Sequence, residues 1–208
     1  KEPESFNGKL RPYQREGLSW FDFLEDFGFG GILADDMGLG KTIQCLAFLE
    51  KRRLQSLVNQ RKDKTFKKQP SLIVAPKSLI YNWVDEASHF TPKLKILNYT
   101  GIDRKHFFEN IQDSDIVVTT YQTLRLDIEQ FKEIEFDCAV IDEAQAIKND
   151  SAKVSKATKL LKAKFRLAMT GTPIENSLAD LFSITEFVNP GLLGKKAFDK
   201  LALASEDK

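Results

Sequence analysis

Short apolar runs alternate with longer amphipathic stretches along this chain. Leu18, Phe21 and Leu24 recur at helical spacing after Pro12, which suits the first turn of a helix, and Gly28 predicts where that helix ends. Short apolar runs followed by turn residues predict buried strands. Strands are expected at 31–34, 72–75, 94–98, 116–119, 138–141 and 166–169, and further helices at 41–53, 78–89, 103–110, 121–131, 151–162 and 178–188.

This alternation predicts an α/β domain with a mainly parallel sheet and helices on both faces. A length of 208 residues fits one such domain. Two segments interrupt the rhythm: residues 60–69 are polar and basic and predict an exposed loop, and the chain turns polar beyond Pro190. We therefore expect one domain over residues 1–190, followed by a connecting segment at 191–208.

Composition changes this picture little. Hydrophobic residues make up 42% and charged residues 29%, which is typical of a soluble globular protein, and the apolar runs are far shorter than the ~20 residues that cross a bilayer. Cys45 and Cys138 lie inside apolar segments, which favours a reducing compartment over a disulfide framework. The two histidines, His89 and His106, offer almost no support for a zinc site.

Charge gives no clear sign of nucleic-acid binding. The net charge is +1, whereas a domain that bound nucleic acid by electrostatics alone would be more basic. In the predicted helix 151–162, Val154, Ala157 and Leu161 form an apolar stripe, so we interpret the lysines around it as a solvated face. The same interpretation is favoured for loop 60–69, although a basic loop could also follow DNA. The lysines in question are at positions 153, 156, 159, 162 and 164.

Residues 35–42 read DDMGLGKT, directly after a predicted strand and before a predicted helix. Glycines such as Gly38 and Gly40 let the backbone curl so that several N–H groups point into one concavity, and the helix N-terminus adds positive potential. Lys41 would then reach the β- and γ-phosphates of a nucleotide, and the Thr42 hydroxyl would bind Mg²⁺. A glycine turn that happens to precede a lysine is the alternative. The flanking strand and helix favour the phosphate loop, although Asp35 stands where its general pattern has glycine.

Two adjacent carboxylates, Asp142 and Glu143, follow the apolar run 138–141 about a hundred residues later. Acidic pairs at strand ends are usually only solvated. Beside a lysine-bearing phosphate loop such a pair has a specific use: Asp142 can hold Mg²⁺ through its water shell, and Glu143 can accept a proton from an attacking water. The order of the two motifs therefore favours a site for nucleotide hydrolysis.

Six sequence blocks occur in the order found in one family. From about residue 9 to 194 the chain resembles the Snf2 group of superfamily 2 helicase-like ATPases, whose version of the phosphate loop carries an acidic residue at the position of Asp35. The resemblance implies a RecA-like P-loop domain, of which residues 1–190 would be the first ATP-binding lobe. The blocks are LRPYQ at 10–14, DDMGLGKT at 35–42, APKSLIYNW at 75–83, TTYQTLR at 119–125, DEAQAIKN at 142–149 and TGTPIEN at 170–176.

The resemblance also implies roles for single residues. Gln14 looks like the glutamine that reads the adenine edge, because an amide is both donor and acceptor. Gln145, Thr170 and Thr172 resemble groups that couple the nucleotide state to the grip on DNA and to a partner lobe. The segments that would face the DNA backbone hold Lys77, Ser78, Trp83, Arg104, Thr120 and Tyr121. For Trp83 and Tyr121, packing in the core is an equal alternative.

The function implied is an ATP- and Mg²⁺-dependent motor that translocates on double-stranded DNA and remodels protein–DNA complexes. Such motors close a second RecA-like lobe over the nucleotide, so this lobe alone is expected to hydrolyse ATP barely. The alternatives are a DNA or RNA helicase of a neighbouring superfamily 2 group and a non-catalytic nucleotide-sensing scaffold. We expect an intracellular location, in a bacterial cytoplasm or a eukaryotic nucleus.

Overall fold

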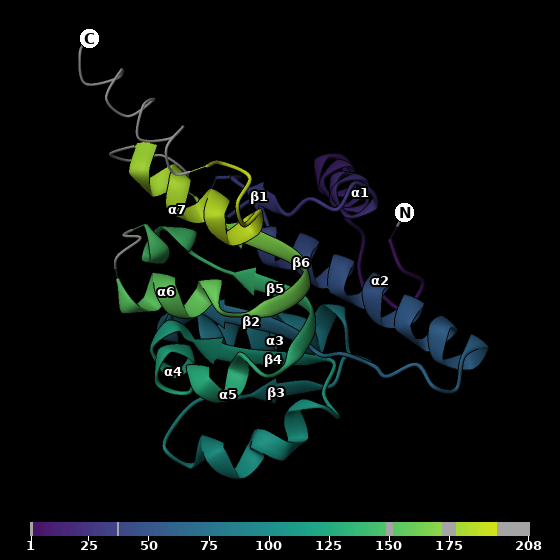
Figure 1. Cartoon of the computed structure of the whole chain (residues 1–208). Coiled ribbons are helices and arrows are strands. Elements are labelled where there is room, and N and C mark those ends of the chain that lie inside the picture. The colour runs from purple at the N-terminus through teal and green to yellow at the C-terminus, as the bar shows by residue number, and fades with distance from the viewer. Residues whose placement is uncertain (1, 37, 149–151, 172–177, 195–208) are drawn as a thin grey trace.

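A parallel sheet lies between two layers of helices (Figure 1) in the computed structural model, which describes residues 2–36, 38–148, 152–171 and 178–194. Within these residues the sheet has 6 strands in the order β1-β6-β5-β2-β4-β3, and all the neighbouring pairs are parallel. The predicted α/β class is therefore confirmed. The strands are β1 (Gly31–Leu33), β2 (Ser71–Ala75), β3 (Ile96–Asn98), β4 (Ile116–Thr120), β5 (Glu135–Ile141) and β6 (Lys162–Met169).

Each face of the sheet buries its own apolar core. Along β2, Ile73 and Ala75 point into the core beneath one helical layer, while Leu72 and Val74 point into the other, as the alternation of a strand requires. The first layer consists of α1 (Pro12–Asp26), α2 (Lys41–Lys62) and α3 (Ile80–Phe90). The second consists of α4 (Tyr121–Leu126), α5 (Ile128–Phe131), α6 (Lys153–Lys159) and α7 (Leu178–Val188).

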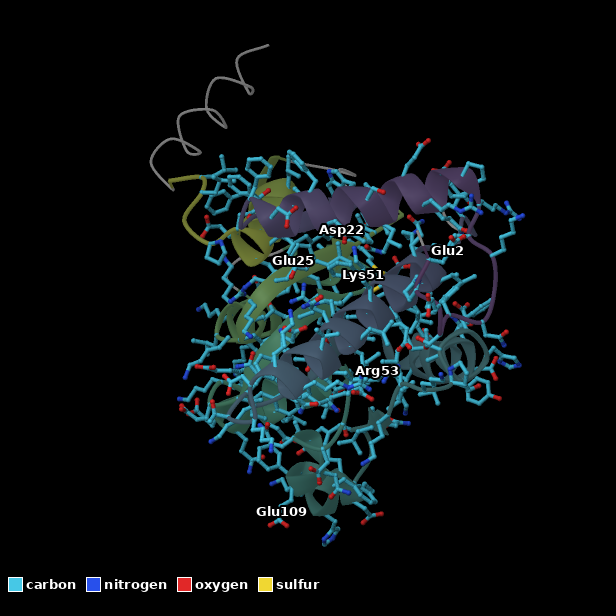
Figure 2. All side chains as sticks on the ribbon, turned by 90° about the vertical axis from the view of Figure 1, so that its right-hand side faces the viewer. Glu2, Asp22, Glu25, Lys51, Arg53 and Glu109 are labelled. Carbon is cyan, nitrogen blue, oxygen red and sulfur yellow. The ribbon has the colours of Figure 1, made fainter. Side chains whose placement is uncertain are left out.

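Ion pairs join α1 to α2 on the outer face of the first layer. Lys51 Nζ lies 2.5 Å from Asp22 Oδ2, and both side chains are visible in Figure 2 between the two helices. Arg52 is largely buried and pairs with Glu25 of α1 at 2.6 Å and with Asp137 of β5 at 2.7 Å. The same guanidinium therefore links both helices to the sheet beneath them.

The carboxyl ends of the parallel strands meet at one edge of the sheet. β1 is followed by the glycine-rich loop 34–40, β6 by Thr170, and β5 by Asp142. Because β1, β6 and β5 are neighbours, these three strand ends lie side by side. Parallel α/β sheets bind their ligands at this edge, so the topology brings together groups that lie far apart in the sequence.

Several predicted boundaries are wrong. Helix α2 continues to Lys62, so residues 60–62 of the expected basic loop are helical. The rest of the expected loop, residues 63–69, is only partly exposed. Phe66 is half-buried there, and Lys164 Nζ lies over its ring, 5.9 Å from the ring centroid. Residues 103–111 form a 3-10 helix, η2 (Asp103–Ile111), in place of an α-helix. The stretch 121–131 is divided at Asp127, whose φ and ψ of −110° and 17° interrupt the helix.

The lysine-rich region also differs from its prediction. Helix α6 spans only Lys153–Lys159, and Lys162 already begins β6. Lys162 and Lys164 therefore lie on a strand, and the lysines do not share one helical face. Leu161 is buried although it lies outside the helix. Val154 and Ala157 of the predicted stripe do pack inward from α6, so only the helical placement of Leu161 is wrong.

Within the described ranges, no helix is both long and apolar enough to span a bilayer. Cys45 and Cys138 are both buried beneath the first helical layer, and burial raises the pKa of the Cys138 thiol to about 12. Protonated, buried thiols of this kind pack as small apolar side chains and are poor nucleophiles.

Candidate active site

The loop between β1 and α2 has the backbone curl that a phosphate site requires. Gly38 and Gly40 have φ values of 84° and 76°, in the left-handed region where a side chain is disfavoured. Gly40 is the N-cap residue of α2, so the unpaired N–H groups and positive potential at the start of a 22-residue helix face the loop. This arrangement can bind an anionic phosphate group.

The Lys41 side chain lies across the loop. Its ammonium group donates to the carbonyl oxygens of Asp35 at 2.7 Å and Asp36 at 3.1 Å. The Asp35 carboxylate accepts a hydrogen bond from Gln44 Nε2 at 3.2 Å, which ties the start of the loop to α2. The acidic residue at position 35, unusual in a general phosphate loop, therefore has a structural use here.

Gln14 connects α1 to the same loop. Its Oε1 accepts from the Arg11 backbone N–H at 2.8 Å, and its Nε2 donates to the Leu39 carbonyl at 3.1 Å. The Tyr13 hydroxyl donates to the same carbonyl at 2.8 Å. Each end of the Gln14 amide is thus engaged once with backbone, which leaves its second N–H and a second lone pair on the oxygen for an adenine edge. Beside it lies a hollow of ≈ 170 Å³, lined in part by Phe6, Arg11, Gly38 and Phe90.

Asp142 lies at the end of β5 and is 5% exposed. Its Oδ2 accepts from the Trp83 indole N–H at 2.9 Å, and its Oδ1 accepts from the Glu143 backbone N–H at 2.9 Å. Burial raises the pKa of Asp142, while these hydrogen bonds and the charge of Lys41 act in the opposite direction.

Glu143 has an unusual backbone. With φ of 49° and ψ of 58°, it is the one non-glycine residue with positive φ in the described part of the chain. A non-glycine residue in this region stores about 1–3 kcal/mol of strain, and such residues gather at functional sites. Its carboxylate Oε2 accepts from Gln145 Nε2 at 2.6 Å, which leaves the other carboxylate oxygen for a further partner.

A hydrogen-bonded chain joins the ends of β5 and β6. Gln145 donates to Glu143 through Nε2 and accepts from the Thr170 hydroxyl through Oε1 at 2.9 Å. A change at the Glu143 carboxylate can therefore reach the segment that follows β6 through one amide side chain. Thr172, predicted to act with these two residues, lies outside the described residues.

The oxygen donors suit Mg²⁺, which prefers hard oxygen ligands and keeps several waters. The candidates are the Thr42 hydroxyl, in the first turn of α2, and the Asp142 carboxylate. Among the described residues, no three or more His, Cys, Asp or Glu side chains are grouped to hold a metal ion. A cation here would rely on these two side chains together with nucleotide phosphates and water.

Two of the six residues predicted to face DNA lie in the core. Trp83 is 1% exposed and Tyr121 is 8% exposed. Both support Asp142, Trp83 through its indole N–H and Tyr121 through its hydroxyl, which donates to the Asp142 carbonyl at 2.6 Å. Packing in the core, the alternative considered for both, describes them in this structure, and neither side chain is available to a DNA backbone.

The other four lie around one hollow of ≈ 530 Å³. It is bounded by α3, by the ends of β3 and β4 and by α4, and we call it the α3/β4 groove. Lys77, Arg104 and Thr120 line it, and Ser78 is exposed beside it on the turn η1 (Lys77–Leu79). Thr120 also caps α4, since its hydroxyl oxygen accepts from the Thr123 N–H at 3.0 Å. Further residues of the lining are Ile80, Tyr81, Val84, Asn98, Thr100, Gly101, Gln122, Thr123 and Leu126.

Sequence reasoning missed one pairing and one residue that organise these sites. The pairing of Trp83 with Asp142 spans 59 positions and has no spacing signal. Asp127, buried beside the α3/β4 groove, accepts hydrogen bonds from Arg104. A single acidic residue between Leu126 and Ile128 is the only hint that the sequence offers for it.

Comparison with known proteins gives consistent matches. The model of a family described as the SNF2-related domain matches residues 13–204. An uncharacterized ATP-dependent helicase of Mycoplasma pneumoniae is 44% identical over 189 residues, which are 90% of this chain and 17% of that protein. The TATA-binding protein-associated factor mot1 of Schizosaccharomyces pombe is 39% identical over 203 residues, which are 95% of this chain and 10% of that protein.

A solved structure matches as well. The SWI2/SNF2 ATPase core of Sulfolobus solfataricus in complex with dsDNA superposes with a TM-score of 0.85 at 44% identity, and the match covers 96% of this chain and 40% of that one. The chain therefore spans less than half the length of each of these relatives.

Proposed function

Because this chain belongs to the SNF2-related domain family and has its RecA-like fold, we propose that it is the first ATP-binding lobe of a DNA-dependent ATPase. The whole motor would translocate on double-stranded DNA and remodel protein–DNA complexes. One observation carries this proposal: the lysine-bearing loop after β1 and the Asp142–Glu143 pair after β5 lie at the same edge of the sheet, with only β6 between the two strands.

Each group at this edge has a task in phosphoryl transfer. Lys41 would leave the loop carbonyls and bind the β- and γ-phosphates, while the loop N–H groups hold the remaining phosphate oxygens. Thr42 and Asp142 would hold Mg²⁺, which supplies neutralisation of the phosphate charge. Glu143 would accept the proton of the attacking water, oriented by Gln145.

The Gln145–Thr170 hydrogen bond could transmit a change at the nucleotide site to other parts of the motor. When Glu143 changes partner during hydrolysis, Gln145 is free to alter its bond to the Thr170 hydroxyl. We place Thr172 in the same route, because it follows two residues later. In this way the nucleotide state would reach the DNA-facing surface and the second lobe.

We propose that double-stranded DNA binds at the α3/β4 groove. The Sulfolobus solfataricus ATPase core that superposes on this chain is in complex with dsDNA, which supports this partner class. The groove offers the Lys77 ammonium, the hydroxyls of Thr100 and Thr120 and the Arg104 guanidinium. Such groups contact phosphates and sugars without reading bases, so the grip would be independent of sequence.

The second lobe is part of the proposal. This chain spans 40% of the Sulfolobus solfataricus ATPase core, and we propose that residues 1–190 form the first lobe and 191–208 the connection to a second. In related NTPases an arginine supplied to the transferred phosphoryl group is worth about 10³–10⁵ in rate. The lobe alone would therefore bind nucleotide and hydrolyse it barely.

Hydrolysis measured with and without duplex DNA tests this function. The longer protein that carries both lobes should hydrolyse ATP much faster when duplex DNA is added, and this chain alone should be at least about 10³-fold slower. A strand-displacement assay on the longer protein serves as the control, because a helicase would separate strands and a translocase would not. Absence of stimulation by any nucleic acid would favour a nucleotide-sensing scaffold instead.

Replacing Gly40 by alanine is expected to weaken nucleotide binding by about tenfold or more. A side chain at this positive φ costs about 1–3 kcal/mol, and its Cβ would lie 2.6 Å from Gln14 Nε2. The dissociation constant of a fluorescent ATP analogue measures the effect. Gly28→Ala is the matched control, since Gly28 has φ of +72° and nothing within 4 Å. Equal affinity in Gly40→Ala and the unaltered chain would show that the loop does not hold the phosphates.

A further inference from the structure

Asp127 is a buried carboxylate at the edge of the α3/β4 groove. It is 6% exposed and lies at the junction of α4 and α5. Its Oδ2 accepts from Arg104 Nε at 2.6 Å and its Oδ1 from Arg104 Nη2 at 3.0 Å, a bidentate pair. The Tyr99 hydroxyl also donates to Oδ2, at 3.3 Å.

Arg104 extends this contact to the loop that forms one side of the groove. Its Nη1 donates to the Gly101 carbonyl at 2.8 Å, at the turn where Gly101 has φ of +85°. The base of the same loop is held on β4, because Tyr99 N donates to Val118 O at 2.9 Å and the Thr119 hydroxyl donates to Tyr99 O at 2.8 Å. Loop 99–104 is therefore fixed at its base by the sheet and at its turn by Arg104.

The guanidinium is only partly used inside the protein. Three of its five N–H groups point to Asp127 and Gly101. The remaining two are available on a side chain that lines the groove and is 15% exposed. Asp127 thus orients the two remaining N–H groups of Arg104, although Asp127 itself does not line the groove.

We infer that Asp127 is the positioning residue of the α3/β4 groove: through Arg104 it holds loop 99–104 in the shape that receives a nucleic-acid backbone. This inference rests on the proposed DNA-binding function and assigns within it a residue that would not touch DNA.

The sign of one substitution separates positioning from simple electrostatics. Asp127→Asn removes a negative charge next to the groove, so long-range electrostatics alone predicts tighter DNA binding. Loss of the bidentate pair instead releases the Arg104 guanidinium and the Gly101 turn, which predicts weaker binding despite the more positive charge. Only the positioning role makes affinity fall as the protein becomes more basic.

The test measures binding of this chain to a fluorescently labelled duplex by anisotropy. We expect Asp127→Asn to raise the dissociation constant for duplex DNA about tenfold, the size of a lost charged hydrogen bond. Affinity for a fluorescent ATP analogue should stay unchanged. Arg104→Lys should weaken DNA binding as well, because an ammonium keeps the charge but cannot form the bidentate pair.

Asp137→Asn is the matched control. Asp137 also pairs with a buried arginine, Arg52, but lies beneath α2, away from the α3/β4 groove. It should lower thermal stability without changing DNA affinity, so a general loss of folding is distinguished from a loss of positioning. Equal or tighter DNA binding by folded Asp127→Asn, with normal binding by the unaltered chain, would overturn the inference alone. Failure of the unaltered chain to bind any duplex would overturn the proposed function and this inference with it.

Discussion

Replacing Glu143 by glutamine is expected to slow ATP hydrolysis by about 10²–10⁴-fold, the range that general-base catalysis contributes. An amide cannot accept the proton of an attacking water. Glutamine has the size and shape of glutamate, and its Oε1 can still accept from Gln145 Nε2, a bond of 2.6 Å in this structure. The substitution therefore removes the base while it keeps the hydrogen-bonded chain to Thr170.

The measurement is single-turnover hydrolysis by the longer protein in saturating duplex DNA, together with the dissociation constant of a fluorescent ATP analogue. Hydrolysis should fall, and nucleotide affinity should stay within a few-fold. Glu133→Gln is the control, since Glu133 is an exposed glutamate whose partner is Lys162 at 3.7 Å, away from the candidate site. A near-normal rate in Glu143→Gln would remove Glu143 from the role of base and would leave the proposed mechanism without one.

Replacing Trp83 by phenylalanine is expected to destabilise the fold by about 1–3 kcal/mol, because a buried carboxylate oxygen loses its donor. Trp83 is 1% exposed, and its indole N–H is the contact of Asp142 Oδ2 at 2.9 Å. The smaller ring also leaves a cavity, whose cost is the same at every pH. The pH-dependent part of the loss therefore reports the carboxylate.

The sign of that pH dependence follows from the pKa. Burial holds the pKa of folded Asp142 above its ordinary value of 3.8, so its ionisation lowers stability as the pH rises through the window between these two values. The Trp83 hydrogen bond lowers the pKa, and without it the pKa of Asp142 rises further. The destabilisation by Trp83→Phe should therefore be largest at neutral pH and should shrink as the pH falls toward 3.8.

Urea unfolding at several pH values gives the stability, and the same variant of the longer protein gives a second measure. If ionised Asp142 holds Mg²⁺, the acid limb of its hydrolysis profile should move to higher pH in Trp83→Phe. The control is Trp20→Phe, because Trp20 is 37% exposed and no described hydrogen bond joins it to Asp142. A loss of stability that is independent of pH would mean that Trp83 acts only by its volume.

The candidate nucleotide site was largely predictable from the sequence. Its parts are local: a strand, a glycine-rich turn, a lysine and a helix within residues 31–42, and two carboxylates directly after an apolar strand. Covalent spacing alone brings such groups to a strand end, and a parallel sheet brings the strand ends to one edge. The adenine role of Gln14 and the coupling role of Thr172 remain predictions, since the structure engages the first with backbone and does not describe the second.

The surroundings of that site were not predictable in the same way. The resemblance placed Trp83 and Arg104 alike in segments expected to face DNA, with packing in the core as an equal alternative for Trp83. The fold buries Trp83 against Asp142 and folds Arg104 onto Asp127. Asp127 itself divides a helix that periodicity predicted as continuous, because its side chain serves partners outside the helix.

By itself, the sequence determined the α/β alternation, the phosphate loop, the acidic pair and the family, since each is written in residues close together along the chain. Only the tertiary structure shows which polar side chains are buried and position other residues, and which are exposed to solvent or ligand. The pairs that settle this question, Trp83 with Asp142 and Arg104 with Asp127, are 59 and 23 positions apart. Such pairings arise only when the sheet order places distant strand ends together, because no local periodicity encodes the burial of a polar group or the partner that satisfies it.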